Sequence, residues 1–78
     1  MKEAHAQTLI AAGVVEDVVV LRVADGWEVW IHGENIPPDL GNRVRHTRRD
    51  AVRVWANLET AVAWARKLGW KHRIGVEG

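Results

Sequence analysis

The chain contains two β-rich runs joined by a dipeptide typical of turns, in the segment Asp17-Val18-Val19-Val20-Leu21-Arg22-Val23-Ala24-Asp25-Gly26-Trp27-Glu28-Val29-Trp30-Ile31-His32. β-Branched and aromatic residues, which are enriched in strands, dominate both sides of the dipeptide Asp25-Gly26. Asp and Gly tolerate the positive φ that a two-residue hairpin loop requires. We therefore expect residues 17–24 and 27–32 to pair as an antiparallel hairpin.

With Asp25-Gly26 as the loop, Ala24 faces Trp27, Arg22 faces Val29, and Val20 faces Ile31. Alternation then places one apolar set on the expected core face: Val18, Val20, Trp27, Val29 and Ile31. The opposite face carries Val19, Leu21, Val23, Trp30 and His32. Because that face is also apolar, we expect a helix or another subunit to cover part of it. Trp30, beside His32, is either an anchor for a partner or a residue covered by the first helix, and the sequence does not choose between them.

Helical spacing and end signals predict two helices. Residues 3–12 place Ala6, Leu9 and Ile10 on one side, and Gly13 is positioned to end that helix. Asn57 is a favourable N-cap for a helix over residues 58–68, with Gly69 as its stop. The apolar stripe of this helix is Leu58, Ala61, Val62, Ala65 and Leu68, with Trp64 at its edge.

The remaining segments complete a single small domain over residues 1–78. Pro37-Pro38 places a loop between residues 33 and 41, because proline excludes helix and central strand. Residues 43–55 read as one bent strand or two strand pieces, and residues 70–76 as a short final strand. The expected order is α-β-β-β-α-β, an α+β fold with a mostly antiparallel sheet packed with two helices.

Charge is strongly segregated along this near-neutral chain, whose formal net charge is +1. Nine of its eleven basic residues lie between Arg43 and Arg73, where two acids leave +7. Residues 1–42 hold two basic and seven acidic residues, or −5. Such segregation points to nucleic acid or an acidic partner. The alternative is that the two halves pair their charges within one domain.

The basic segment contains five arginines: Arg43, Arg45, Arg48, Arg49 and Arg53. On a single strand Arg43, Arg45 and Arg49 would share one face and Arg48 the other, and Arg53 is in phase with the first set if no bulge intervenes. Arginine suits bidentate contacts to phosphate and guanine, and a basic sheet can enter the major groove. Trp55 is in phase with Arg53 and could stack on a sugar or base. The alternative is an edge strand whose charges only prevent aggregation.

Other classes of site have little support in the sequence. Serine and cysteine are absent, so neither a serine or thiol nucleophile nor a disulfide framework is present, and no Gly-rich phosphate loop occurs. Four histidines are scattered at positions 5, 32, 46 and 72, without the spacing of a metal site. The apolar run 18–21 is far too short to span a membrane. We expect a soluble, cytoplasmic, non-enzymatic protein without cofactor or metal.

The segment Arg53-Val54-Trp55-Ala56-Asn57-Leu58-Glu59-Thr60-Ala61, continued by Trp64-Ala65-Arg66-Lys67-Leu68-Gly69, resembles the ParC family of plasmid partition-associated proteins. Residues 4–32 also resemble that family's helix and Val-rich hairpin. The resemblance implies a small accessory protein encoded beside a partition ATPase and a centromere-binding protein. The same segment looks like the third strand and helix of AP2-type and integrase arm-binding domains, which bind DNA through a sheet.

From these features we expect an accessory protein of plasmid partition or mobile-element maintenance. Its arginine segment would bind double-stranded DNA or an acidic partition partner. The alternative is a protein–protein adaptor or homodimer whose interface is the face with Trp30 and His32, with arginines that merely solubilise it.

Overall fold

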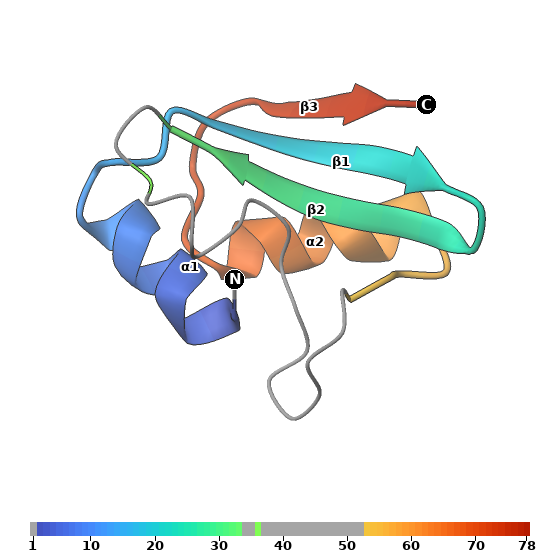
Figure 1. The fold of residues 1–78 in the computed structure, drawn as a ribbon, viewed down its shortest axis with the longest axis horizontal. Coiled ribbons are helices and arrows are strands. Elements are labelled where there is room, and N and C mark those ends of the chain that lie inside the picture. The colour runs from blue at the N-terminus through green and yellow to red at the C-terminus, as the bar shows by residue number, and fades with distance from the viewer. Residues whose placement is uncertain (1, 34–35, 37–52) are drawn as a thin grey trace.

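A computed structural model describes residues 2–33, 36 and 53–78 of the chain. Its elements, in order, are α1 (Glu3–Ala11), β1 (Asp17–Val23), β2 (Gly26–His32), α2 (Leu58–Lys67) and β3 (Ile74–Glu77). The strands form one sheet in the order β2-β1-β3, and both helices lie on the same side of it (Figure 1). This two-layer arrangement confirms the expected α+β class.

The predicted hairpin is present, with a different register. β1 and β2 pair antiparallel, and the observed partners are Arg22 with Trp27, Val20 with Val29, and Val18 with Ile31. The pairing therefore differs by two residues from the expected one, and the turn is Ala24-Asp25. Because side chains alternate with a period of two, this shift changes every partner and leaves every face as predicted.

Gly26 is the first residue of β2 because another segment approaches it closely. Trp55 pairs with Trp27 at the outer edge of β2, with N–H···O distances of 2.8 and 2.9 Å between their backbones. A Cβ at position 26 would lie 2.2 Å from the carbonyl oxygen of Trp55, and the φ of Gly26 is +148°. The glycine that sequence reasoning assigned to the loop is thus required beside the Trp55 backbone.

The core lies between the sheet and the two helices. Val18, Val20, Val29 and Ile31, all on the predicted core face, are fully buried. Trp27 is half-buried and packs against this core, as its position on the same face predicts. Buried residues from the helices and connections complete the cluster: Ala6, Val15, Ile36, Trp55, Ala61, Ala65, Leu68 and Trp70.

Both helices form for the expected local reasons. The Asn57 Oδ1 accepts hydrogen bonds from the Thr60 N–H at 2.9 Å and the Thr60 hydroxyl at 2.7 Å, which confirms the N-cap of α2. Gly69 follows with φ +105° and ends the helix. In α1, Ala6 is fully buried, and Gly13 has φ +78° after the last turn. Apolar residues of both helices therefore pack into the same core.

The final strand is shorter and oriented differently than expected. β3 begins at Ile74, not at Trp70, and pairs parallel to β1, with Val18 opposite Ile74 and Val20 opposite Val76. The sheet is therefore mixed.

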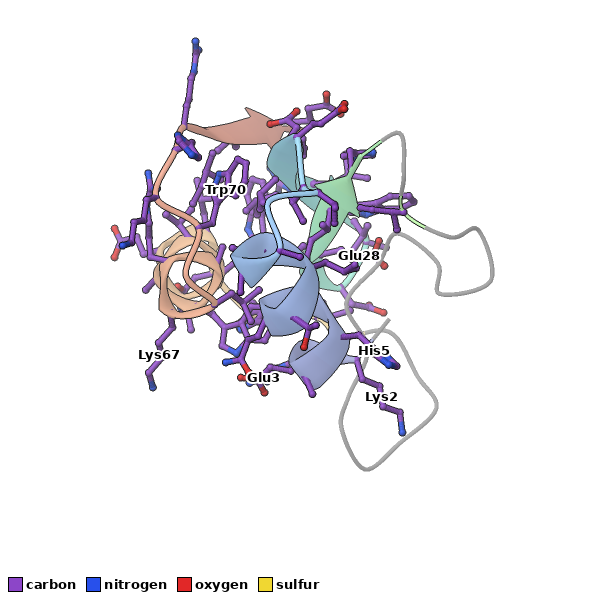
Figure 2. The ribbon with its side chains drawn as sticks, turned by 90° about the vertical axis from the view of Figure 1, so that its left-hand side faces the viewer. Lys2, Glu3, His5, Glu28, Lys67 and Trp70 are labelled. Carbon is purple, nitrogen blue, oxygen red and sulfur yellow. The ribbon has the colours of Figure 1, made fainter. Side chains whose placement is uncertain are left out.

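The chain cannot form a strand at 70–73 because Trp70 turns inward (Figure 2), where its indole N–H donates to the Arg73 carbonyl at 3.0 Å. The Arg66 guanidinium also binds the carbonyls of Trp70 and His72.

Two other expectations concern the middle of the chain and the second face of the sheet. Of the strand expected over residues 43–55, positions 43–52 lie outside the described residues, and Trp55 contributes the bridge to β2.

Neither α1 nor α2 covers the face with Trp30, because both belong to the core on the opposite face. The possibility that the first helix covers Trp30 is therefore wrong.

Replacing Gly26 with Ala should destabilise the fold by more than about 1 kcal/mol, since the new Cβ meets a backbone oxygen and the φ is strained. Gly13→Ala is the matched control, because its φ is also positive while a Cβ there meets nothing within 4 Å. Urea denaturation measures both free energies of unfolding. A loss at Gly26 no larger than at Gly13 would contradict the close approach of Trp55.

Replacing Asn57 with Ala should cost about 1 kcal/mol, because the N-cap hydrogen bonds of α2 are lost. Leu68→Ala should cost about 2–5 kcal/mol, since Leu68 is buried against the core. Thermal and urea unfolding of the two variants would show this order. Equal and small losses from both would contradict the placement of α2.

Candidate functional site

The structure describes two of the residues proposed to bind nucleic acid or a partner, Arg53 and Trp55. Arg43, Arg45, Arg48 and Arg49 lie outside the described residues. Arg53 is half-buried, and Trp55 is 5% exposed where it bridges to β2. The site is therefore built around the segment that leads into α2.

The guanidinium of Arg53 lies over two indole rings. Its central carbon is 4.9 Å from the ring centroid of Trp55 and 5.3 Å from that of Trp64. The two rings contact each other, with centroids 4.7 Å apart and planes tilted by 47°. Both distances are within the range of cation–π attraction, so the aromatic pair positions the charge of Arg53.

The same residues line a shallow cavity of about 490 Å³ on the outer side of α2, which we call the Arg53 cavity. Its lining residues are Arg53, Trp55, Thr60, Ala63, Trp64 and Lys67. The four residues from α2 share one helical face, because they recur at intervals of three and four. Lys67 points away from the helix axis (Figure 2). Local helix periodicity thus places Lys67 and Trp64 beside Arg53.

The Arg53 cavity combines positive charge with aromatic surface. Two of its described lining residues are cationic and none is acidic. In the described part of the chain, the side chains of Arg53 and Lys67 have no hydrogen-bond or ion-pair partner. Arginine held against aromatic rings keeps N–H donors for a phosphate or carboxylate, while an indole edge can contact a sugar or base. This chemistry suits an extended anion.

Trp30 and His32, the second pair of candidate residues, lie on the face of the sheet opposite the helices. Their rings stack with centroids 6.2 Å apart, and the Trp30 indole N–H donates to the Glu28 carboxylate at 3.0 Å. Both side chains are half-buried. With Val19, Leu21 and Glu77 they line a hollow of about 250 Å³. The pair therefore forms an ordered surface separate from the Arg53 cavity.

Neither a metal site nor a membrane-spanning helix is found among the described residues. No three His, Asp or Glu side chains in that part of the chain gather closely enough to hold a metal ion. No helix there is long and apolar enough to cross a membrane.

The sequence pattern places Trp64 at the edge of an apolar stripe, and Lys67 falls in the last turn of the helix expected over residues 58–68. It did not connect either residue to Arg53. The pattern that could have done so is the spacing of Thr60, Trp64 and Lys67 along one helical face next to an Arg-x-Trp segment. That inference requires knowing that residues 53–55 pack against α2, and helical spacing alone does not reveal this tertiary contact.

Replacing Arg53 with Met should lower the free energy of unfolding by about 0.5–1 kcal/mol, because length is kept while the cation–π attraction is lost. Arg53→Lys should lose less, since a cation remains near both rings. Urea denaturation of both variants measures the difference. A methionine variant as stable as the wild type would show that the two indoles do not hold Arg53 through its charge.

Comparison of the chain with protein-family models, curated proteins and solved structures finds no match. The resemblance to the ParC family therefore rests on the quoted residues, and its implications stay expectations.

Proposed function

We propose that this chain is a small, non-enzymatic, cytoplasmic binding module that serves plasmid partition or mobile-element maintenance by binding double-stranded DNA. The Arg53 cavity and the arginine segment before it make the contacts. The observation that carries the proposal is the guanidinium of Arg53 lying over Trp55 and Trp64 beside Lys67. A partition ATPase or a centromere-binding protein is the proposed partner in that process.

The composition of the Arg53 cavity favours nucleic acid over a small ligand. The hollow is open and shallow, so it fits a chain that passes across it better than an enclosed molecule. Two cations can neutralise successive phosphates, and Trp64 supplies a ring for a sugar or base between them. Phosphate contacts of this kind give affinity and register without specifying a sequence.

The arginine segment directly precedes Arg53 in the sequence and adds further positive charge. Arg43, Arg45, Arg48 and Arg49 precede Arg53 closely, and all are arginine where solvation alone would be served equally by lysine. A closely spaced series of such residues increases the number of phosphates contacted and therefore the salt dependence of binding.

A second candidate is a protein–protein adaptor whose interface is the face with Trp30 and His32. The observation that favours it is that both helices lie on the other face, while Trp30 is half-buried in an ordered stack with His32. Tryptophan is enriched among residues that dominate interface energies. Binding through this face would be insensitive to salt.

Titration of a labelled duplex with the wild type at several salt concentrations tests the DNA proposal. Wild type should bind at low salt, and affinity should fall log-linearly as salt rises. Arg53→Gln combined with Lys67→Gln should weaken binding and reduce the log–log slope by about two units, one for each lost phosphate contact. Replacing Arg45, Arg48 and Arg49 with Gln should reduce it by about three units.

Arg22→Gln is the matched control. Its guanidinium also lies over an indole, 6.0 Å from the ring centroid of Trp27, but Arg22 does not line the Arg53 cavity. The control should bind DNA as the wild type does. No binding by the wild type even near about 50 mM salt would reject the proposal. Salt-resistant binding to a partition protein that is lost in Trp30→Ser would establish the adaptor instead.

A further inference from the structure

The two outer edges of the sheet differ in what pairs with them. β2 is outermost on one side, and its edge receives the backbone of Trp55 at Trp27. β3 is outermost on the other side, and Figure 1 shows no described segment beyond it. Within the described residues, β3 therefore presents an unpaired edge, and such edges readily accept another strand.

The chain that leads into β3 is held in place before any partner arrives. Arg66 binds the carbonyls of Trp70 and His72, and the Trp70 indole N–H binds the Arg73 carbonyl. Trp70 itself is 6% exposed, so this turn is anchored in the core. A strand fixed in this way loses little conformational freedom on pairing, which favours association.

In and just before β3, one apolar side chain and two charged side chains are exposed to solvent. Val76 is 51% exposed although it lies on the helix-covered side of the sheet, opposite the buried Val20. Glu77 lies on the other side, and Arg73 directly precedes the strand. Both are exposed, and neither side chain has an ion-pair partner among the described residues. Gly75 separates them, and a Cβ there would make only an ordinary contact with Val19 at 3.4 Å. The fold itself thus does not require glycine at this position.

We propose that two copies of this chain pair through their β3 edges, antiparallel about Gly75, to form one continuous six-stranded sheet. In this register Gly75 faces Gly75 of the second copy, Ile74 faces Val76, and Arg73 faces Glu77. Each apolar pair covers an exposed Val76, and each pair of opposite charges lies directly across from the other strand. Gly75 leaves the symmetry axis clear of side chains, as expected where another backbone approaches closely.

The charges select this arrangement over its alternatives. Parallel pairing would put Arg73 opposite Arg73 and Glu77 opposite Glu77, and like charges directly opposite are destabilising. A shift of two residues in one direction would pair Glu77 with Lys71 but leave Arg73 opposite Gly75 and Val76 opposite His72. The same shift in the other direction would leave Glu77 opposite Gly75. Only the register centred on Gly75 satisfies both charged residues of each strand and both apolar ones.

Charge exchange at the paired positions tests the proposal, with sedimentation over a concentration series and no DNA present. Wild type should form dimers. Arg73→Glu and Glu77→Arg should each raise the dimer dissociation constant about ten-fold or more, because each variant places like charges opposite one another twice. An equimolar mixture of the two variants should associate as wild type does, since both charge pairs are restored in the heterodimer.

Lys71→Glu is the matched control, because it makes the same change of charge at an exposed residue that lies outside β3 and outside the pairs that define this register. It should dimerise as wild type does. Circular dichroism and thermal unfolding confirm that each variant is folded. The proposal is overturned by a wild type that stays monomeric, by Lys71→Glu weakening association as much as Arg73→Glu, or by a variant mixture that fails to associate.

Discussion

Burial of four β-branched side chains on one face of the β1–β2 hairpin holds the sheet and the two helices together. Val18, Val20, Val29 and Ile31 are fully enclosed, and each helix contributes alanine or leucine to the space above them. Among the described residues, eight further buried side chains join the same cluster. β1 lies at the centre of the sheet because both remaining strands must pair with it to complete that face.

Placing both helices on one face determines where the candidate functional surfaces lie. α2 directs its buried stripe to the sheet and its other face outward, and that outward face meets Arg53 and Trp55 to form the Arg53 cavity. The opposite face of the sheet keeps Trp30, His32 and the buried carboxylate residue Glu28 in one ordered row. The two surfaces therefore lie on opposite sides of the core and can be altered independently by mutation.

Local patterns predicted the parts of the structure that local physics controls. Alternation identified the core face of the hairpin, and Asn57 identified the start of α2 because its cap hydrogen bonds reach only three residues ahead. The hairpin register was wrong because the position of Gly26 is set by the carbonyl of Trp55, which is distant in sequence. The start and direction of β3 depend likewise on the burial of Trp70. Of the candidate site, Arg53 and Trp55 were identified, whereas the contribution of Trp64 and Lys67 required tertiary structure.

Pairing of two β3 edges would give the proposed DNA-binding function a geometry that one copy lacks. In the proposed register the two-fold axis is perpendicular to the sheet, so both helical layers, and both Arg53 cavities with them, lie on the same side. A two-fold pair of cationic sites matches the pseudo-two-fold symmetry of duplex DNA, and linked sites bind more tightly than either alone. The faces with Trp30 would form the opposite side of the same sheet, where a partition protein could bind without displacing DNA.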